Sequence, residues 1–173
     1  MSTTTFALIF GIAFTLAGIA GMFPAALTPA PAHDPALALN VLHGYLLGLF
    51  PVNVLNSASH IALGVAGLAA ATTEQRARLY ARGLAVVCGG LGILGMLPTL
   101  NTTFGLMPLH GNDVWLNLGA AAIAAYFGWR ADIPVLNESD DRRHGMSDRR
   151  HALNRVTFER RRGAYDRRMP LGT

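Results

Sequence analysis

The sequence contains no lysine, and its first 129 residues are almost free of charge. All fourteen basic residues are arginine, and only six charged residues occur before Arg130. A soluble domain normally carries about 25% charged residues. This chain has 14%, while 51% of its residues are hydrophobic. The shortage of charge argues against a soluble globular domain for residues 1–129.

Cysteine is nearly absent as well, since Cys88 is the only one. A single cysteine can form no intrachain disulfide and no redox pair. The sequence also shows no nucleophile–base pair, acidic dyad or glycine-rich phosphate loop, which are the usual signs of catalysis. We therefore expect a protein that is not an enzyme and needs no cofactor.

Four long apolar stretches dominate the chain, at approximately residues 5–23, 52–71, 80–97 and 113–129. About 20 residues cross the roughly 30 Å hydrocarbon layer of a membrane, and a chain in lipid must satisfy its backbone hydrogen bonds internally. The pattern predicts an all-α integral membrane four-helix bundle over residues 1–129. Residues 36–50 are too short for a fifth span. We expect an interfacial or re-entrant helix there, or a long second helix kinked at Pro51.

The arginines lie on one side of the predicted topology. Arg76, Arg78 and Arg82 surround the connection between the second and third stretches, and the other eleven begin at Arg130. Arginine-rich connections stay in the cytoplasm. Four spans with this bias predict a multi-pass protein of the inner membrane whose two termini both face the cytoplasm.

The apolar region repeats itself. GIAGMFP (18–24) returns as GILGMLP (92–98), and GLFP (48–51) returns 57 residues later as GLMP (105–108). The halves therefore look like two duplicated helical hairpins. When the halves are aligned with this spacing of 57 residues, three polar positions correspond, namely Asn53 with His110, Asn56 with Asp113, and His60 with Asn117.

Because polar residues occur at equivalent positions of both hairpins, we expect them to stabilise the hairpin fold and not to form a chemical site. Asn56 and Asp113 have side chains suited to an N-cap, and Asp113 would also lie at the positive end of a helix dipole. His60 and Asn117 fall one turn further in, where a side chain can bond to a neighbouring helix. The structural polar set is Asn53, Asn56, His60, His110, Asp113 and Asn117.

The stretch LGLFPVNVLNSASHIALGVAGL (47–68), with its second copy GLMPLHGNDVWLNLGAAA (105–122), resembles an uncharacterised family of bacterial four-span membrane proteins, domain of unknown function 4383. The resemblance covers approximately residues 6–129. It rests on the Gly-Leu-x-Pro-x-Asn element together with the spacing of Asn56 and His60. It implies a four-helix membrane domain and supplies no activity. His110 departs from the element in the second copy.

Small residues recur at four-residue spacing in all four stretches, which lets helix backbones approach closely. We expect these stripes to pack one bundle internally, and the alternative is a surface that docks another membrane subunit. The residues are Ala13, Ala17, Gly21, Ala62, Ala66, Ala70, Cys88, Gly92, Ala120, Ala124 and Gly128.

Histidines on the predicted outer side leave a metal or haem site open. Imidazole binds haem, copper and zinc, and His43, His60 and His110 are the candidates. Their spacing matches no known ligand pair on one helix. We expect first a packing or accessory subunit of a membrane assembly. The alternatives are an oligomeric pore or small-solute transporter, and third a redox subunit that binds haem or metal.

Residues 130–173 form a tail of opposite character. Residues 142–173 hold ten arginines against three acids, and anionic lipid headgroups at the cytoplasmic face attract such a segment. We expect a flexible tail that contacts lipid and binds no nucleic acid, because acids interrupt the basic runs. A homo-oligomer or a larger membrane complex is the other expected partner. The arginines expected at the lipid are Arg142, Arg143, Arg149, Arg150, Arg160, Arg161, Arg162, Arg167 and Arg168.

Overall fold

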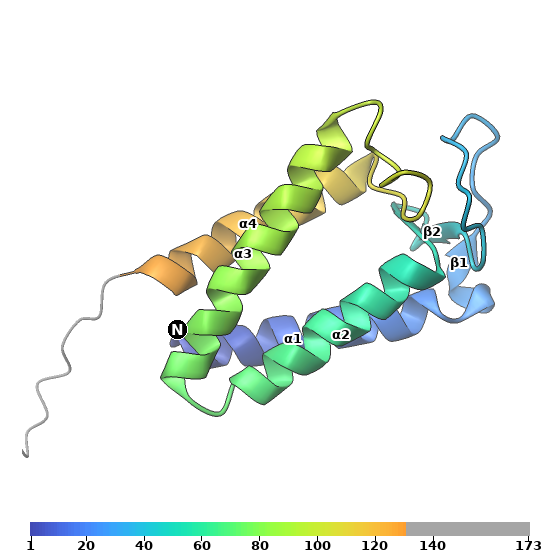
Figure 1. The fold of residues 1–173 in the computed structure, drawn as a ribbon. Coiled ribbons are helices and arrows are strands. Elements are labelled where there is room, and N and C mark those ends of the chain that lie inside the picture. Colours follow the sequence, from blue (N-terminus) through green and yellow to red (C-terminus); the bar gives the residue numbers. More distant parts are fainter. Residues whose placement is uncertain (131–173) are drawn as a thin grey trace, which may run out of the picture. The chain divides into compact units, whose positions relative to one another are not determined.

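The computed structural model describes residues 1–130, and four α-helices make up most of them (Figure 1). They are α1 (Thr3–Gly21), α2 (Val54–Ala70), α3 (Glu74–Met96) and α4 (Asn112–Trp129). The mostly helical class predicted from the sequence is confirmed. Each helix falls on one of the four apolar stretches, although α3 begins at residue 74 and not at 80. By length and composition, α1 and α3 could cross a membrane, and α2 is a shorter apolar helix.

Acceptor side chains fix where three of the helices begin. The Ser2 and Thr73 side chains accept hydrogen bonds from the first turns of α1 and α3, and Asn53 does so for α2. The N-caps predicted at Asn56 and Asp113 are therefore wrong. The first lies three residues inside the cap of α2, and the second lies two residues after Gly111, which precedes α4.

The connection between α1 and α2 is a small antiparallel sheet, and the helix predicted within 36–50 is wrong. A short 3-10 turn, η1 (Pro24–Ala26), leads into β1 (Leu27–Thr28), β2 (Gly44–Leu46) and β3 (Phe50–Val52), in the order β1-β2-β3. The chain turns at Leu47 and Gly48, whose φ angles are +55° and +68°. A right-handed helix cannot pass through that left-handed backbone, so neither an interfacial helix nor a kinked extension of α2 forms.

Glycines bring the helices together in two pairs, α1 with α2 and α3 with α4. A Cβ placed on Gly18 of α1 would lie 2.6 Å from the Ser57 carbonyl oxygen and 2.7 Å from the Ile61 nitrogen of α2. On α3, a Cβ on Gly92 would lie 2.8 Å from Cγ of Leu118 on α4. Gly18 and Gly92 correspond in the sequence repeat, and so do Ile61 and Leu118. The two pairs thus use equivalent contacts.

The predicted stripes of small residues are only partly correct in either pair, and Ala120 of the second pair is only half-buried. Cys88, Gly92, Ala124 and Gly128 are buried where α3 meets α4. In the first pair only Gly21 of the predicted stripes is buried, and the other glycines buried there are Gly11, Gly18, Gly64 and Gly67. The alanines Ala62 and Ala66 are exposed.

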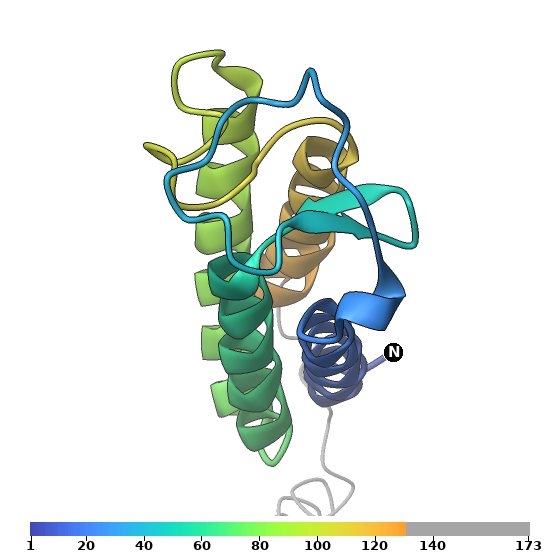
Figure 2. The ribbon, with the colours of Figure 1, turned by 90° about the vertical axis from the view of Figure 1, so that its right-hand side faces the viewer.

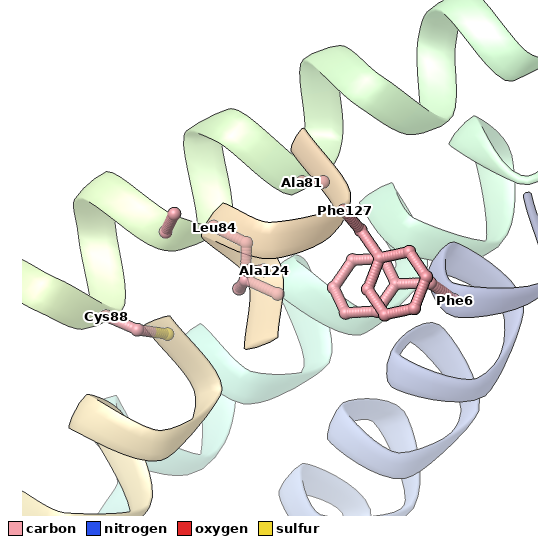
Figure 3. Packing of buried hydrophobic residues seen from close by; sticks show 7 residues of the cluster. Phe6, Ala81, Leu84, Cys88, Ala124 and Phe127 are labelled. Carbon is pink, nitrogen blue, oxygen red and sulfur yellow. The ribbon is translucent and has the colours of Figure 1, made fainter. Parts of the chain in front are cut away.

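The two helix pairs meet at the end that carries the N-terminus. Figure 3 shows the Phe6 ring of α1 stacked on the Phe127 ring of α4, with ring centroids 4.8 Å apart. Beside them, the Glu74 carboxylate accepts hydrogen bonds from the backbone N–H groups of Thr3 and Thr4, at 3.3 and 3.4 Å. These contacts join the start of α1 to α3 and α4.

The close approach of α1 to α2 predicts opposite effects for two glycine substitutions. Gly18→Ala should destabilise the protein by about 1–3 kcal/mol, because the new methyl group would overlap the α2 backbone. Gly90→Ala is the matched control, since a Cβ there meets no atom within 4 Å and alanine favours helix by about 1 kcal/mol. Thermal unfolding followed by circular dichroism measures both. Equal stability of the two variants would contradict the glycine-mediated contact.

Candidate functional site

Asn53 holds three segments together at the end of the molecule opposite Phe6. Its side chain is fully buried. The amide oxygen accepts from the Asn56 N–H at 2.9 Å, and the amide nitrogen donates to the carbonyl oxygens of Leu39, at 2.9 Å, and Leu106, at 2.7 Å. One side chain therefore caps α2 and binds both the connection before α2 and the connection before α4.

The two connections also bond directly to each other. The Gly105 carbonyl oxygen accepts from the backbone N–H groups of Ala38 and Leu39, at 2.9 and 3.1 Å. The Asn112 side-chain amide donates to the Leu49 carbonyl oxygen at 3.2 Å. Figure 2 shows the two connections running across each other over the ends of the helices. This end is a hydrogen-bonded layer, in contrast to the apolar packing around Phe6.

The sequence repeat reappears in the backbone of this layer. Leu47 and Gly48 have φ angles of +55° and +68°, and their equivalents Phe104 and Gly105 have +60° and +84°. The equivalence ends at His110, which stands where the first copy has Asn53. α4 has no side-chain cap, and Nε2 of His110 is buried with no hydrogen-bond partner among residues 1–130.

The other predicted polar residues converge just below Asn53. Nδ1 of His60 donates to the Asn56 carbonyl oxygen at 2.8 Å, and the Asn117 amide donates to the Asp113 carbonyl oxygen at 2.9 Å. Both bonds join residues four apart in one helix, so the predicted bonds to neighbouring helices are wrong. Asn56, His60 and Asn117 still line one cavity of about 20 Å³, which brings the two copies together.

The candidate metal ligands do not share a site. His43 donates from Nδ1 to the Val52 carbonyl oxygen at 3.1 Å. Burial lowers the pKa of His110, Asp34 raises it, and His43 lowers it further. His60 lies apart with the polar residues of the helices. In the part of the chain that the structure describes, no group of three His, Cys, Asp or Glu side chains could hold a metal ion.

Sequence reasoning gave no sign that Asp34 and Tyr45 interact. Burial raises the pKa of Tyr45 to about 12, and a hydrogen bond and the charge of Asp34 add to the effect. The two residues are eleven apart in a connection whose path the sequence pattern does not reveal. Asp34 therefore lies near Tyr45 of β2 within this connection.

An apolar groove between α1 and α4 was also missed. Its volume is about 410 Å³. The signal for it was present, because Ala13, Ala17 and Ala120 belong to the predicted stripes and here leave space in place of a helix contact. The Phe14 ring stacks on the His60 ring at the groove, with centroids 5.2 Å apart. The lining residues are Ile9, Phe10, Ala13, Phe14, Ala17, His60, Trp115, Leu116, Gly119, Ala120 and Ile123.

Basic residues of the described chain lie at the end opposite the hydrogen-bonded layer. Nε of Arg82 donates to the Gly128 carbonyl oxygen at 2.8 Å, and its guanidinium lies 5.8 Å from the centre of the Trp129 ring. Arg130 lies 5.2 Å from the centre of the Phe127 ring. The nine tail arginines expected at lipid lie outside the described residues, and that contact stays a prediction.

Comparison with known proteins places the helical region in one family. The family model of DUF4383, a domain of unknown function, matches residues 4–130, which is the helical part without the tail. No curated protein and no solved structure matches the chain. The match spans well over half of the sequence, so the chain belongs to the DUF4383 family.

Proposed function

We propose that this chain is a non-enzymatic protein of the bacterial inner membrane, in which all four helices cross the bilayer. It serves as a packing or accessory subunit of a membrane assembly. The observation that carries the proposal is the apolar exterior of the helices, which a water-soluble bundle would direct inward.

Large apolar side chains cover the outside of the helices, while small residues make many of the contacts between helices. Leu16 is 60% exposed, Leu79 73% and Val86 68%. Ala81 and Ala124, by contrast, are fully buried. An amphipathic helix of a soluble protein shows the reverse, with its apolar stripe facing the core. In lipid, small residues pack helices together and large apolar residues face the acyl chains.

Helix lengths fit a bilayer with small adjustments. At 1.5 Å per residue, α1 and α3 are about 29 and 35 Å long, and α2 and α4 about 26 and 27 Å. The hydrocarbon layer is about 30 Å thick. The shorter helices leave a mismatch of a few Å, which local thinning of the bilayer accommodates at a fraction of a kcal/mol per Å. Four spans are therefore compatible with the geometry.

The positions of charge support cytoplasmic termini. Arg76, Arg78 and Arg82 lie at the start of α3, and the hydrogen bond from Arg82 to Gly128 brings the end of α4 to the same level. The bonds from Thr3 and Thr4 to Glu74 bring the N-terminus there as well. The opposite connections, residues 22–53 and 97–111, contain no arginine. Arginine marks the cytoplasmic side.

An accessory role is favoured over a pore or a redox subunit by what the polar side chains bond to. Asn53, His60 and Asn117 hydrogen-bond to backbone carbonyl groups of their own chain. Transport pathways and redox centres instead direct several ionisable groups toward one cavity or metal, whereas His60 is the one ionisable residue that lines the cavities described for residues 1–130. The proposed partners are another membrane subunit or further copies of this chain, with anionic lipids at the tail.

Reporter fusions test the membrane topology. A reporter that fluoresces only in the cytoplasm should give signal when fused after Thr173. The same reporter inserted within residues 99–103 should give none, and a phosphatase that is active only outside the cytoplasm should give signal there. Fluorescence from the insertion at 99–103 would overturn the four-span arrangement.

Purification from native membranes tests the accessory role. In mild detergent, the tagged chain should retain a stoichiometric protein partner or further copies of itself, and its absorbance spectrum should lack a Soret band. Quantitative mass spectrometry and crosslinking report the composition. A monomer that carries haem would contradict the proposed role and favour the redox alternative.

A further inference from the structure

We propose that the groove between α1 and α4 binds a lipid-soluble aromatic alcohol, whose hydroxyl group donates a hydrogen bond to Nε2 of His60. The inference goes beyond the accessory role but rests on the proposed membrane location, since the ligand would enter from the bilayer. It assigns a ligand class to a site built by three helices.

The size and lining of the groove suit a small apolar molecule. Its volume of about 410 Å³ lies within the range of about 300–1,000 Å³ that is usual for ligand pockets. Ile9 and Phe10 on α1, and Leu116 and Ile123 on α4, supply apolar walls. Gly119 keeps the groove open, because a Cβ there would meet no atom within 4 Å.

His60 offers the groove a single acceptor. Its Nδ1 lies 2.8 Å from the Asn56 carbonyl oxygen, which can only accept, so Nδ1 carries the proton. In the neutral ring Nε2 then has a free lone pair. Nε2 has no hydrogen-bond partner among residues 1–130, and His60 lines the groove. A ligand with a hydrogen-bond donor is therefore the complement of this atom.

Aromatic residues beside His60 favour a ring over an aliphatic chain. The Phe14 ring is stacked on the imidazole at an interplanar angle of 22°, which fixes the orientation of His60. Phe10 and Trp115 add further aromatic faces to the lining. An acyl chain would fill the space but leave Nε2 unpaired.

Quenching of Trp115 fluorescence tests the site. The chain has two tryptophans, so Trp129→Phe leaves Trp115 as the reporter on the groove. The protein in lipid nanodiscs is titrated with 4-bromophenol and with 4-bromoanisole, which has no donor. The half-quenching concentration of 4-bromophenol should be about three- to tenfold lower with His60 than in His60→Leu, as expected for one hydrogen bond. That of 4-bromoanisole should not change, which also shows an intact groove.

A second variant separates the groove from bulk lipid. Gly119→Leu should abolish saturable quenching by both probes, because its side chain fills the groove. If His60→Leu fails to fold, His60→Phe replaces it, since a phenyl ring can stack on Phe14 as the imidazole does and carries no acceptor. Equal half-quenching by 4-bromophenol with and without His60 would overturn the proposal and indicate a groove filled by lipid chains or a second copy.

The proposal of the ligand site and the proposal of the membrane location can be disproved by different results. Release of the chain from native membranes by alkaline carbonate would contradict the membrane location. Selective quenching by 4-bromophenol in detergent micelles would still support the groove. A carbonate-resistant protein without that selectivity would leave the membrane location standing and remove the ligand site.

Discussion

The amide of Asn53 is the interaction on which the hydrogen-bonded end of the molecule, opposite Phe6, depends. It caps α2 through its oxygen and holds two connections through its nitrogen, and it is fully buried. Each of these groups would otherwise be a buried donor or acceptor without a partner, which costs about 1–3 kcal/mol apiece. At the other end, stacking of Phe6 on Phe127 joins the helix pairs. The groove lies along α1 and α4 between these two attachments.

The repeat of the helix pair explains why few hydrogen bonds between the two copies are enough to hold them together. Each helix pair closes on its own glycines, Gly18 against Ile61 and Gly92 against Leu118, so only the pairs must be joined. Asn53 does this because its second N–H reaches Leu106 in the other copy. The second copy has His110 at this place and starts α4 without a side-chain cap. One bridging amide therefore serves both copies.

The helices could be predicted from the sequence because an apolar run is a local signal, whereas the parts that were missed depend on distant contacts. β2 pairs with β1 through residues that lie 17 and 19 positions apart, so part of the sheet depends on residues outside 36–50. Asn53 and Asn56 are both good caps, and only the extended backbone at Asn53 decides between them. Likewise, Ala13 and Ala17 form the same stripe whether a helix or a groove lies opposite. The polar residues could be singled out from the sequence because they recur at equivalent positions of the repeat, and this does not require knowing what each one bonds to.

Replacing Asn53 with aspartate tests the bridging role most directly. Aspartate keeps the acceptor that caps α2, but it loses both N–H donors and sets a carboxylate oxygen against the carbonyl groups of Leu39 and Leu106. If the bridge holds the hydrogen-bonded end together, Asn53→Asp should lower the free energy of unfolding by about 2–4 kcal/mol, at least as much as Asn53→Ala. Denaturant unfolding of the purified protein measures this. An Asn53→Asp protein as stable as the wild type would show that Asn53 is only a helix cap.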